Sequence, residues 1–377
     1  MSRPLRLREI GREEHLAFVA DRPSVSHLQV PSWGGVKPDW RAVSVGWYDD
    51  DRGGALVGAG LVLLRPLPGL KRYFAYLPEG PAIDWEAADL GRWLDPLLAH
   101  LKGLGAFSVR MGPPVVARRW SAGAVRAGLA DPGARRLGDI EPTRRDPRAA
   151  AVADRLRRAG WRRSEPGHGD GFAAGQPRHV FQVPLAGRSL DEVERGLGQQ
   201  WRRNIRKAEK AGVKVVQGDR EDLAAFHELY RETAERDRFL PRPLGYFRRM
   251  WAELTAEDPD RMRVYLAHHD GEVGAAATML TVGDHVWYSY GASSSRKREV
   301  RASNALQWRM LSDAHAKGAR VYDLRGITDS LDEDDPLTGL LRFKAGTGGE
   351  AVEYLGEWDH PLNRLLHKAF GLCLSRR

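Results

Sequence analysis

The sequence contains a single cysteine, Cys373, among its 377 residues. One thiol forms no internal disulfide, and without a group of cysteines no structural zinc site of the usual kind is expected. The 12 histidines also lack the spacing of metal ligands. These absences predict a protein of a reducing compartment that holds no metal ion.

Long hydrophobic runs are missing too. No stretch approaches the roughly 20 apolar residues that a membrane-spanning helix needs. The charged N-terminus, residues 1–13, lacks the apolar core of a signal peptide. We therefore expect a cytoplasmic protein. Its basic, amphipathic tail, residues 362–374, could lie on the inner face of the membrane, although packing against the first domain is the more ordinary role for such a segment.

Positive charge is what the sequence has in excess. Lys and Arg number 59 against 50 Asp and Glu, which gives a net charge of +9 at pH 7. Such an excess favours anionic partners, namely nucleic acid, phosphates or an acidic membrane surface. The same excess could also arise from a GC-rich genome that encodes Arg where Lys would serve, and it would then indicate no binding partner.

Two stretches of the chain predict the same order of elements, a meander of strands followed by a helix and a further strand. In the first stretch these are strands at 42–47, 61–64 and 73–77, a helix that ends at Gly103 and a strand at 106–111. In the second they are strands at 264–268, 276–281 and 285–290, a helix at 303–316 and a strand at 319–324. This order resembles the acyltransferase fold of the GCN5-related N-acetyltransferases. We therefore expect an α+β chain with two such domains in tandem.

Residues 113–166 lie between the two repeats and are rich in Arg, Pro, Gly and Ala. We expect one helix in this stretch, at 149–159, which ends at Gly160. The rest is interpreted as a solvated connection.

A basic helix is expected from Ser189 to Gly212. Ser189 and Glu192 have the spacing of a capping box, and Gly212 is suited to close the helix. Its last turns carry the cations Arg202, Arg203, Arg206, Lys207 and Lys210. Cations at this end complement the helix dipole in any case, but five of them in nine residues also make a phosphate-binding face.

A glycine-containing loop is absent where an acyl-CoA enzyme of this fold needs one. In such enzymes the loop N–H groups and the following helix N-terminus hold the pyrophosphate. Residues 295–304 of the second repeat contain no glycine, and residues 84–90 of the first contain none either. The sequence therefore predicts acyl transfer from another carrier, and an anionic carrier would suit the cations Arg296, Lys297, Arg298 and Arg301.

A short segment near the C-terminus, Leu340–Glu350, places Phe343 and Lys344 before a glycine-rich turn. A lysine beside an aromatic ring and such a turn suits an anionic or acyl-bearing ligand. No Ser-His-Asp or Cys-His set is evident that would indicate a covalent route. We therefore expect acyl transfer without a covalent enzyme intermediate.

The ordered set of these segments resembles the FemABX family, tRNA-dependent aminoacyltransferases that build the interpeptide bridge of peptidoglycan. The matching segments are 28–37, 176–179, 201–210, 236–242, 290–294, 307–308, 322–327, 341–344 and 348–350. The resemblance implies a first domain of residues 1–165, completed by 351–377, and a second domain of residues 166–350. It also implies that a small amino acid (Gly, Ala or Ser) is transferred from aminoacyl-tRNA, without a cofactor. The acceptor would be a UDP-linked or lipid-linked muramyl pentapeptide. A monomer is expected.

Roles for individual residues follow from the same resemblance. Lys37 and Arg242 would bind the diphosphate of the acceptor, and Tyr246 and Tyr290 would hydrogen-bond the acceptor. Phe343 and Lys344 would lie at the acceptor end of the tRNA, as the catalytic pair. The tRNA would contact Arg202, Arg203, Arg206, Lys207, Arg296, Lys297, Arg298 and Arg301.

The chain also departs from the family pattern. Gly112 stands where many relatives carry an acidic residue before the proline, and 246–264 is too short for the helical hairpin that some relatives insert there. Other functions stay open at this point. The chain could be an acyl-CoA-dependent N-acyltransferase, a non-catalytic tRNA-binding protein, or a family member that acts on another amine, such as that of a surface polysaccharide.

Overall fold

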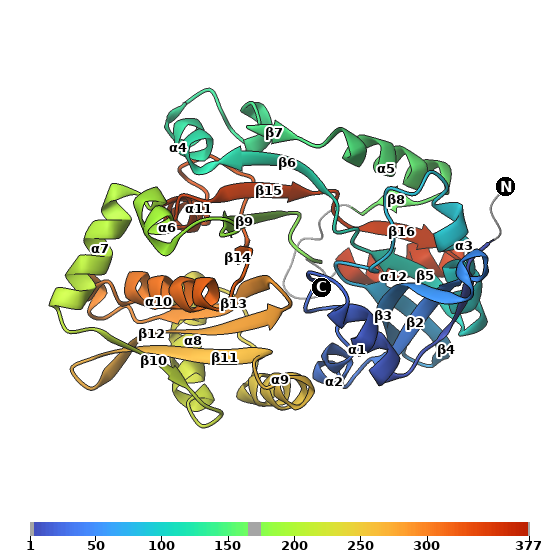
Figure 1. Ribbon diagram of the computed structural model, residues 1–377, viewed down its shortest axis with the longest axis horizontal. Coiled ribbons are helices and arrows are strands. Elements are labelled where there is room, and N and C mark those ends of the chain that lie inside the picture. Colours follow the sequence, from blue (N-terminus) through green and yellow to red (C-terminus); the bar gives the residue numbers. More distant parts are fainter. Residues whose placement is uncertain (1–3, 165–174, 376–377) are drawn as a thin grey trace. The chain divides into compact units, whose positions relative to one another are not determined.

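The computed structural model describes residues 4–164 and 175–375, with side chains up to residue 371. Cys373 therefore has no described side chain. The contacts divide the chain into two units. Unit 1 consists of residues 1–117, 145–178 and 353–377, and unit 2 of residues 118–144 and 179–352. Figure 1 shows the elements of both.

Unit 1 is built on a sheet with the order β1-β2-β3-β4-β5-β16-β8. Its strands are β1 (Arg6–Glu9), β2 (Arg41–Asp49), β3 (Ala55–Leu67), β4 (Leu70–Leu77), β5 (Ala106–Met111), β8 (Arg162–Arg163) and β16 (Trp358–Pro361). Its helices are α1 (Arg12–Ala20), α2 (Ser32–Val36), α3 (Gly91–Gly103), α5 (Pro147–Arg158) and α12 (Arg364–Ser375). The strands and the helix predicted for the first repeat are confirmed as β2, β3, β4, α3 and β5.

Unit 2 contains a sheet with the order β10-β11-β12-β13-β14-β9-β15-β6-β7. These strands are β6 (Val116–Ser121), β7 (Arg144–Arg145), β9 (His179–Pro184), β10 (Lys214–Gly218), β11 (Met262–His269), β12 (Glu272–Val282), β13 (His285–Ser293), β14 (Val321–Gly326) and β15 (Glu350–Tyr354). The helices are α4 (Ala122–Ala130), α6 (Leu190–Gly196), α7 (Gln199–Lys210), α8 (Leu223–Asp237), α9 (Leu244–Glu257), α10 (Ala302–Ala316) and α11 (Thr338–Ala345). The second predicted repeat is confirmed as β11, β12, β13, α10 and β14.

The two repeats differ where their parallel strands meet. In unit 1, β4 pairs with β5 from Tyr73 to Leu77. In unit 2, β13 pairs with β14 only from His285 to Trp287, although β13 continues to Ser293. The strands of unit 2 therefore separate after Trp287, whereas those of unit 1 stay paired.

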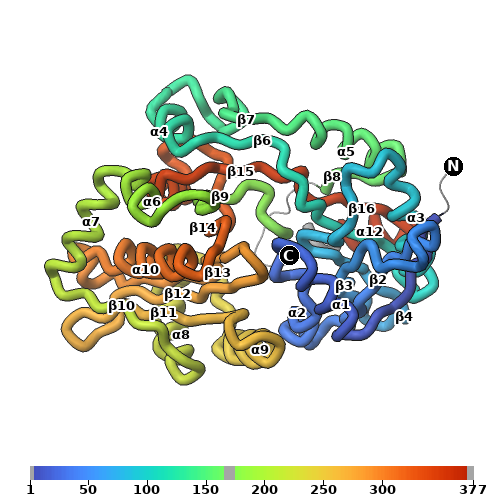
Figure 2. The backbone as a smooth tube through the Cα atoms, viewed as in Figure 1, coloured from blue at the N-terminus to red at the C-terminus, as the bar shows by residue number. Residues whose placement is uncertain are grey.

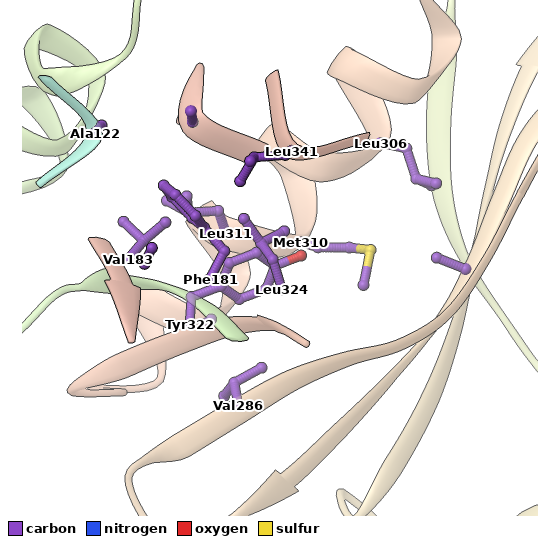
Figure 3. Close-up of a cluster of buried hydrophobic side chains, with 14 of the residues drawn as sticks. Ala122, Phe181, Val183, Val286, Leu306, Met310, Leu311, Tyr322, Leu324 and Leu341 are labelled. Carbon is purple, nitrogen blue, oxygen red and sulfur yellow. The ribbon is translucent and has the colours of Figure 1, made fainter. Parts of the chain in front are cut away.

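The core of unit 2 ties the separated strands to the helices around them. Figure 3 shows Met310 and Leu311 of α10 converging on Phe181 of β9 and Leu324 of β14, with Leu341 of α11 above them. All five side chains are buried. Burying apolar side chains of this size contributes about 1.5–3 kcal/mol each, so α11 is held firmly over the end of β14.

Residues 118–144 lie in unit 2, whereas the family resemblance implied that they belong to the first domain. The reason is that β6 is an ordered strand next to β15, and the helix α4 follows it at once. The Ala122 N–H donates to the Gly349 carbonyl over 2.8 Å, and Trp120 and Val125 are in the unit 2 core. Figure 2 shows the backbone from β6 into α4 running beside β15. Only the α5 portion of this stretch matches the expected helix.

The basic helix predicted from Ser189 to Gly212 is two helices, so the prediction of one continuous helix is wrong. The capping box of Ser189 and Glu192 is present at the start of α6. The chain then leaves helical geometry at Leu197, and the Gly198 N–H donates to the Gly346 carbonyl over 2.8 Å instead of to α6. This bond begins α7 in a new direction, and Gly212, with φ +76°, follows its end.

Candidate functional site

Lys344 is a buried residue at the end of α11, with 4% of its surface exposed. Its Nζ donates to the Gly326 carbonyl over 2.6 Å and has a longer contact of 3.5 Å with the Arg325 carbonyl. The pKa of this amine is lowered to about 7, mainly by burial; the Asp323 charge raises it and the Arg325 charge lowers it. An amine that titrates near neutral pH is typical of functional sites.

The loop before α11 explains how Lys344 is placed. The Asp335 carboxylate accepts from the Leu337 N–H over 2.8 Å, and the Thr338 hydroxyl donates to the Asp332 carbonyl over 2.6 Å. These bonds begin the helix, and Leu341 and Ala345 bury its inner face. The acidic residues 332–335 therefore lie in the turn that leads into the helix that carries Lys344.

Phe343 has a different environment from Lys344. Its ring lies 4.7 Å from the Trp201 ring, and its carbonyl accepts from the Trp201 Nε1 over 2.9 Å. Leu197 and Ile205 complete this small apolar cluster. The contacts of Phe343 therefore join α11 to α7, and a role for its ring against a ligand stays a prediction.

The glycine-rich turn after Lys344 is explained by close packing. Gly348 has φ +75°, and a Cβ placed on it would lie 2.0 Å from the Gly196 carbonyl oxygen. A Cβ on Gly346 would lie 2.1 Å from Trp201. Only glycine fits such positions, so this turn brings α11 against the junction of α6 and α7.

Tyr246 and Tyr290 lie together, as residues with a shared ligand would. Their hydroxyl oxygens are 3.2 Å apart, with Tyr246 on α9 and Tyr290 on β13. Burial and the neighbouring Tyr290 raise the pKa of Tyr246 well above its usual value, so it is a neutral hydrogen-bonding group. The guanidinium of Arg242 lies 5.4 Å from the centre of the Tyr246 ring. Three of the four predicted acceptor-binding residues thus form one group in unit 2.

A bulge in the sheet directs Tyr290. The pairing of β12 with β13 shifts register between Thr278 and Met279, and the Thr278 hydroxyl accepts from the Tyr290 N–H over 3.1 Å. A bulge bends its strand and redirects the side chains beside it. This bulge lies in the part of β13 that has separated from β14.

Lys37, the fourth predicted acceptor-binding residue, belongs to unit 1. It follows α2 directly, and its Nζ lies 5.3 Å from the centre of the Trp33 ring. His27 packs edge-on against the same ring, with centroids 5.5 Å apart. The side chain is half-buried, so the ammonium is held over an aromatic face.

The predicted tRNA-binding residues of α7 divide into two kinds. The guanidinium of Arg202 donates to the carbonyls of Arg195 and Leu197, and so it caps the end of α6. Arg203, Arg206 and Lys207 are exposed. Within residues 4–164 and 175–375, no ion pair or side-chain hydrogen bond holds these three, and they are available to an anionic partner.

The second basic group lies beside α7. The short 3-10 helix η3 (Arg298–Val300) contacts α7, and the Asn204 Nδ2 donates to the Asn304 Oδ1 over 3.3 Å. Lys297 instead pairs with Glu272 over 3.4 Å and with Asp270 over 3.7 Å. The cations of α7 therefore lie beside Arg296, Arg298 and Arg301, and together they are named the α7–η3 surface. The charge of Lys297 is instead used in ion pairs with Asp270 and Glu272.

The last turns of α8 hold the start of this basic loop. Glu232 accepts from the Ser295 N–H over 2.6 Å, and Arg236 donates to the Ser293 carbonyl over 2.7 Å. Thr233 both donates to that carbonyl and accepts from the Ser293 N–H. These bonds fix the end of β13 without the glycine loop that the sequence lacks.

The sequence did not identify Asp323 as a site residue, although its charge raises the pKa of Lys344. Asp323 is 2% exposed, accepts from the Gln182 Nε2 over 2.9 Å and lies 3.4 Å from the His285 Nε2. Burial disfavours its charged form, but the bonds and charges of His285, Arg325 and Gln182 outweigh this and lower its pKa. The available signal was one acidic residue inside an apolar strand.

In unit 1, a carboxyl group lies next to Gly112, the position at which the family resemblance implies an acidic residue. A Cβ placed on Gly112 would lie 3.8 Å from the Glu357 Cγ. Burial raises the pKa of Glu357, against the charge of Arg110, whose Nη1 lies 3.8 Å from it. The C-terminal segment thus places a carboxyl group beside Gly112.

The described residues contain neither a metal centre nor a membrane-spanning helix. No group of three His, Cys, Asp or Glu side chains there is placed to hold a metal ion. None of the helices in that part of the chain is long and apolar enough to cross a membrane.

Comparisons with known proteins agree with this architecture. A family model described as the FemAB family matches residues 10–270, and one described as an acetyltransferase (GNAT) domain matches residues 197–344. Lipid II:glycine glycyltransferases of Staphylococcus haemolyticus (strain JCSC1435) and Staphylococcus aureus (strain MRSA252) are each 25% identical to this chain. Both matches cover 95% of this chain and 93% of the relative.

Two solved structures share the fold. The crystal structure of FemX has a TM-score of 0.79 at 22% identity and covers 97% of this chain and 99% of that chain. A tandem GNAT protein from the clavulanic acid biosynthesis pathway has a TM-score of 0.53 at 14% identity and covers 95% and 98%. The prediction of two tandem acetyltransferase-like domains is therefore confirmed.

Proposed function

Because the chain belongs to the FemAB family, we propose that it is an aminoacyltransferase acting on a peptidoglycan precursor. It transfers a small amino acid, Gly, Ala or Ser, from aminoacyl-tRNA to the side-chain amine of the precursor's stem peptide. The observation that carries the proposal is Lys344, a buried amine with a pKa of about 7 where β13 and β14 have separated. The curated relatives act on lipid II, so a lipid-linked acceptor is the first choice.

The proposed reaction is aminolysis of an ester. The acceptor amine attacks the aminoacyl carbonyl, a C–N bond forms, the C–O bond to the terminal ribose breaks, and the ribose oxygen takes up the proton that the amine loses. An ester is already activated, so positioning and charge stabilisation are the main tasks. Lys344 in its ammonium form stabilises the negative charge that develops on the oxygen.

The α7–η3 surface supports tRNA as the donor. Exposed Arg and Lys side chains without internal partners are suited to phosphates, and their contribution depends on displaced counterions. The surface adjoins α11 through the contact of Trp201 with Phe343. A tRNA backbone bound to α7 would therefore lie on the element that packs directly against the Lys344 helix.

The group of Arg242, Tyr246 and Tyr290 supports an acceptor with phosphate and hydrogen-bonding groups. A guanidinium binds phosphate oxygens strongly, and neutral tyrosine hydroxyls donate to carbonyl or sugar oxygens. Lys37 lies in unit 1, and its part in binding the diphosphate stays a prediction of the family resemblance. The alternatives remain an acyl-CoA donor and a tRNA-binding protein without catalysis.

The test is an in vitro transfer assay with the full-length protein. Radiolabelled glycyl-, alanyl- and seryl-tRNA are offered with UDP-linked and lipid-linked muramyl pentapeptide, and acetyl-CoA is the control donor. Label is expected to move from one tRNA to a precursor. The variant Lys344→Ala should lose roughly 10²–10³-fold in kcat/KM, as for removal of one charge-stabilising group.

Arg342→Ala provides the matched control, because Arg342 lies on the same helix but is exposed and pairs with Glu333. It should keep its activity. Acetyl transfer without transfer from any tRNA would establish the acyl-CoA alternative. Equal affinity for charged and uncharged tRNA, with no transfer, would indicate a binding protein.

A further inference from the structure

Asp323 is a buried carboxylate to which the proposed chemistry gives no task. It lies in β14 between Tyr322 and Leu324, which are both in the core of unit 2. Burying a carboxylate is costly unless it is paired and hydrogen-bonded. The contacts of its two oxygens therefore indicate what this residue does.

One oxygen of Asp323 closes a turn. Its Oδ1 accepts from the Arg325 N–H over 2.6 Å. Arg325 has φ +62°, in the left-handed region that residues other than glycine rarely adopt. The pairing of β14 with β9 also shifts register between Asp323 and Gly326. Aspartate side chains stabilise such local turns by bonding to the backbone two residues on.

This turn presents the carbonyls that bind Lys344. The Gly326 carbonyl accepts from the Lys344 Nζ over 2.6 Å, and the Arg325 carbonyl lies 3.5 Å from the same atom. Both carbonyls belong to the residues whose backbone Asp323 bends. The position of the amine therefore depends on the turn.

The other oxygen of Asp323 anchors the turn to both neighbouring strands. Its Oδ2 accepts from the Gln182 Nε2 of β9 over 2.9 Å and lies 3.4 Å from the His285 Nε2 of β13. Asp323 is also the last residue of β14 that pairs with β13. The anchor thus lies where the two strands begin to separate.

Asp323 also balances the charges around Lys344. Arg325 of β14 is cationic, and Arg126 of α4 donates to the Ala345 carbonyl, over 2.9 Å, on the same helix as Lys344. Arg342 on α11 is paired with Glu333, and His285 of β13 contacts Asp323 itself. Among these groups, Asp323 supplies the negative charge that favours an ammonium at Lys344.

We propose that Asp323 is a positioning residue for Lys344: it holds the turn at Arg325 whose carbonyls bind the amine, and its negative charge favours the ammonium form of that amine. The catalytic consequence rests on the proposed function, but the effect on Lys344 does not. The two are therefore tested separately.

The test titrates Lys344 directly. The chain has 10 lysines, so a protein labelled with 13Cε-lysine gives a simple NMR spectrum, in which the resonance lost in Lys344→Arg identifies Lys344. In Asp323→Asn an oxygen can still accept from the Arg325 N–H, but the charge is gone. The pKa of Lys344 should fall below its wild-type value of about 7.

Two further variants complete the test. Asp313→Asn is the control, because Asp313 accepts from the Tyr265 hydroxyl and does not contact Lys344; the Lys344 titration should be unchanged. Arg325→Gly removes the opposing cation and suits the left-handed turn, so the pKa of Lys344 should rise. This second variant keeps the proposal testable if Asp323→Asn does not fold.

The transfer assay then separates the two proposals. If the proposed function holds, the break in the pH profile of kcat/KM should move to lower pH in Asp323→Asn, in step with the NMR titration. An unchanged Lys344 titration in Asp323→Asn overturns the role of Asp323. A shifted titration in a protein that transfers nothing from any tRNA supports the role of Asp323 and overturns the proposed function.

Discussion

At the scale of single residues, Lys344 shows what a sequence reveals and what it conceals. Its position beside Phe343 and a glycine-rich turn was enough to select it as a candidate. Its burial and its bonds to the carbonyls of β14 depend on residues about 20 positions away in the chain. Phe343, selected on the same pattern, packs against Trp201, because adjacent helix positions point in different directions.

Asp323 could not be selected from the sequence, because its importance comes from three elements that meet in space. An isolated acidic residue in an apolar strand is an uninformative pattern. The contacts with Gln182 of β9 and His285 of β13 exist only once the sheet order is known.

The lowered pKa of Lys344 predicts a pH dependence of stability. The pKa is about 7 in the folded protein against 10.5 for the ordinary side chain. Between these values the unfolded chain holds a proton that the folded protein has lost, so stability should rise with pH across this window. In Lys344→Met, which has similar volume and no ionisable group, this rise should be absent.

The measurement is urea unfolding of both proteins between about pH 7 and pH 9, with linear extrapolation of the free energy of unfolding. The difference between wild type and Lys344→Met should change steadily in favour of the wild type as the pH increases. A constant difference would show that the folded protein does not depress this pKa. Below pH 7 the two curves should run parallel.

At the scale of elements, local sequence signals specified the meanders well. Hairpin turns such as Asp270-Gly271 and helix ends such as Gly103 act within a few residues, so the boundaries of β11, β12 and α3 were predictable. The break between α6 and α7 was not, because it is made by the Gly346 carbonyl from a segment far along the chain. The capping box alone predicts where a helix begins and not where a distant partner ends it.

The α7–η3 surface carries a prediction at this scale. Changing Arg203, Arg206 and Lys207 together to Ala should weaken binding of tRNA and lower the slope of log affinity against log salt by roughly 2–3. These side chains are exposed, so the thermal stability should change little. Binding is measured by fluorescence anisotropy at several salt concentrations.

A control with the same loss of charge changes Arg231, Arg248 and Arg249, which are exposed on α8 and α9 of the same unit. It should retain nearly the wild-type salt slope. If both triple variants lose affinity equally, the net charge of the protein and not this surface governs tRNA binding.

At the scale of the whole molecule, each unit is assembled from separate segments of the chain, because strands far apart in the sequence pair with one another. Residues 118–144 belong to unit 2 and residues 353–377 to unit 1, so neither unit is one continuous segment. From its composition, segment 113–166 was predicted to be mainly a solvated connection. The sequence did not show that it contains β6 and α4, because both are short and pack against β15 and α11, which come from much later in the chain. The return of the C-terminal segment was implied by the family resemblance and by no local pattern.

This arrangement predicts unequal effects of two truncations. β16 lies between β5 and β8 in the unit 1 sheet, and its Trp358 is in the unit 1 core. Ending the chain after Val352 removes that strand, together with the last two residues of β15, and should abolish the cooperative unfolding of unit 1. Ending it after Asn363 removes only α12, whose Phe370 stacks on Phe74 at 5.0 Å. The melting temperature should then fall by roughly 2–4 °C for each kcal/mol of lost packing.

Scanning calorimetry distinguishes the two cases. The longer variant should keep every transition of the full-length protein, shifted to lower temperature, while the shorter one should lose a transition and its enthalpy. If the shorter variant instead unfolds with the full enthalpy, β16 is dispensable and the unit 1 sheet folds without its C-terminal strand. In the expected case unit 1 needs β16, and its sheet is completed only after Lys344 and the rest of unit 2 have been synthesised.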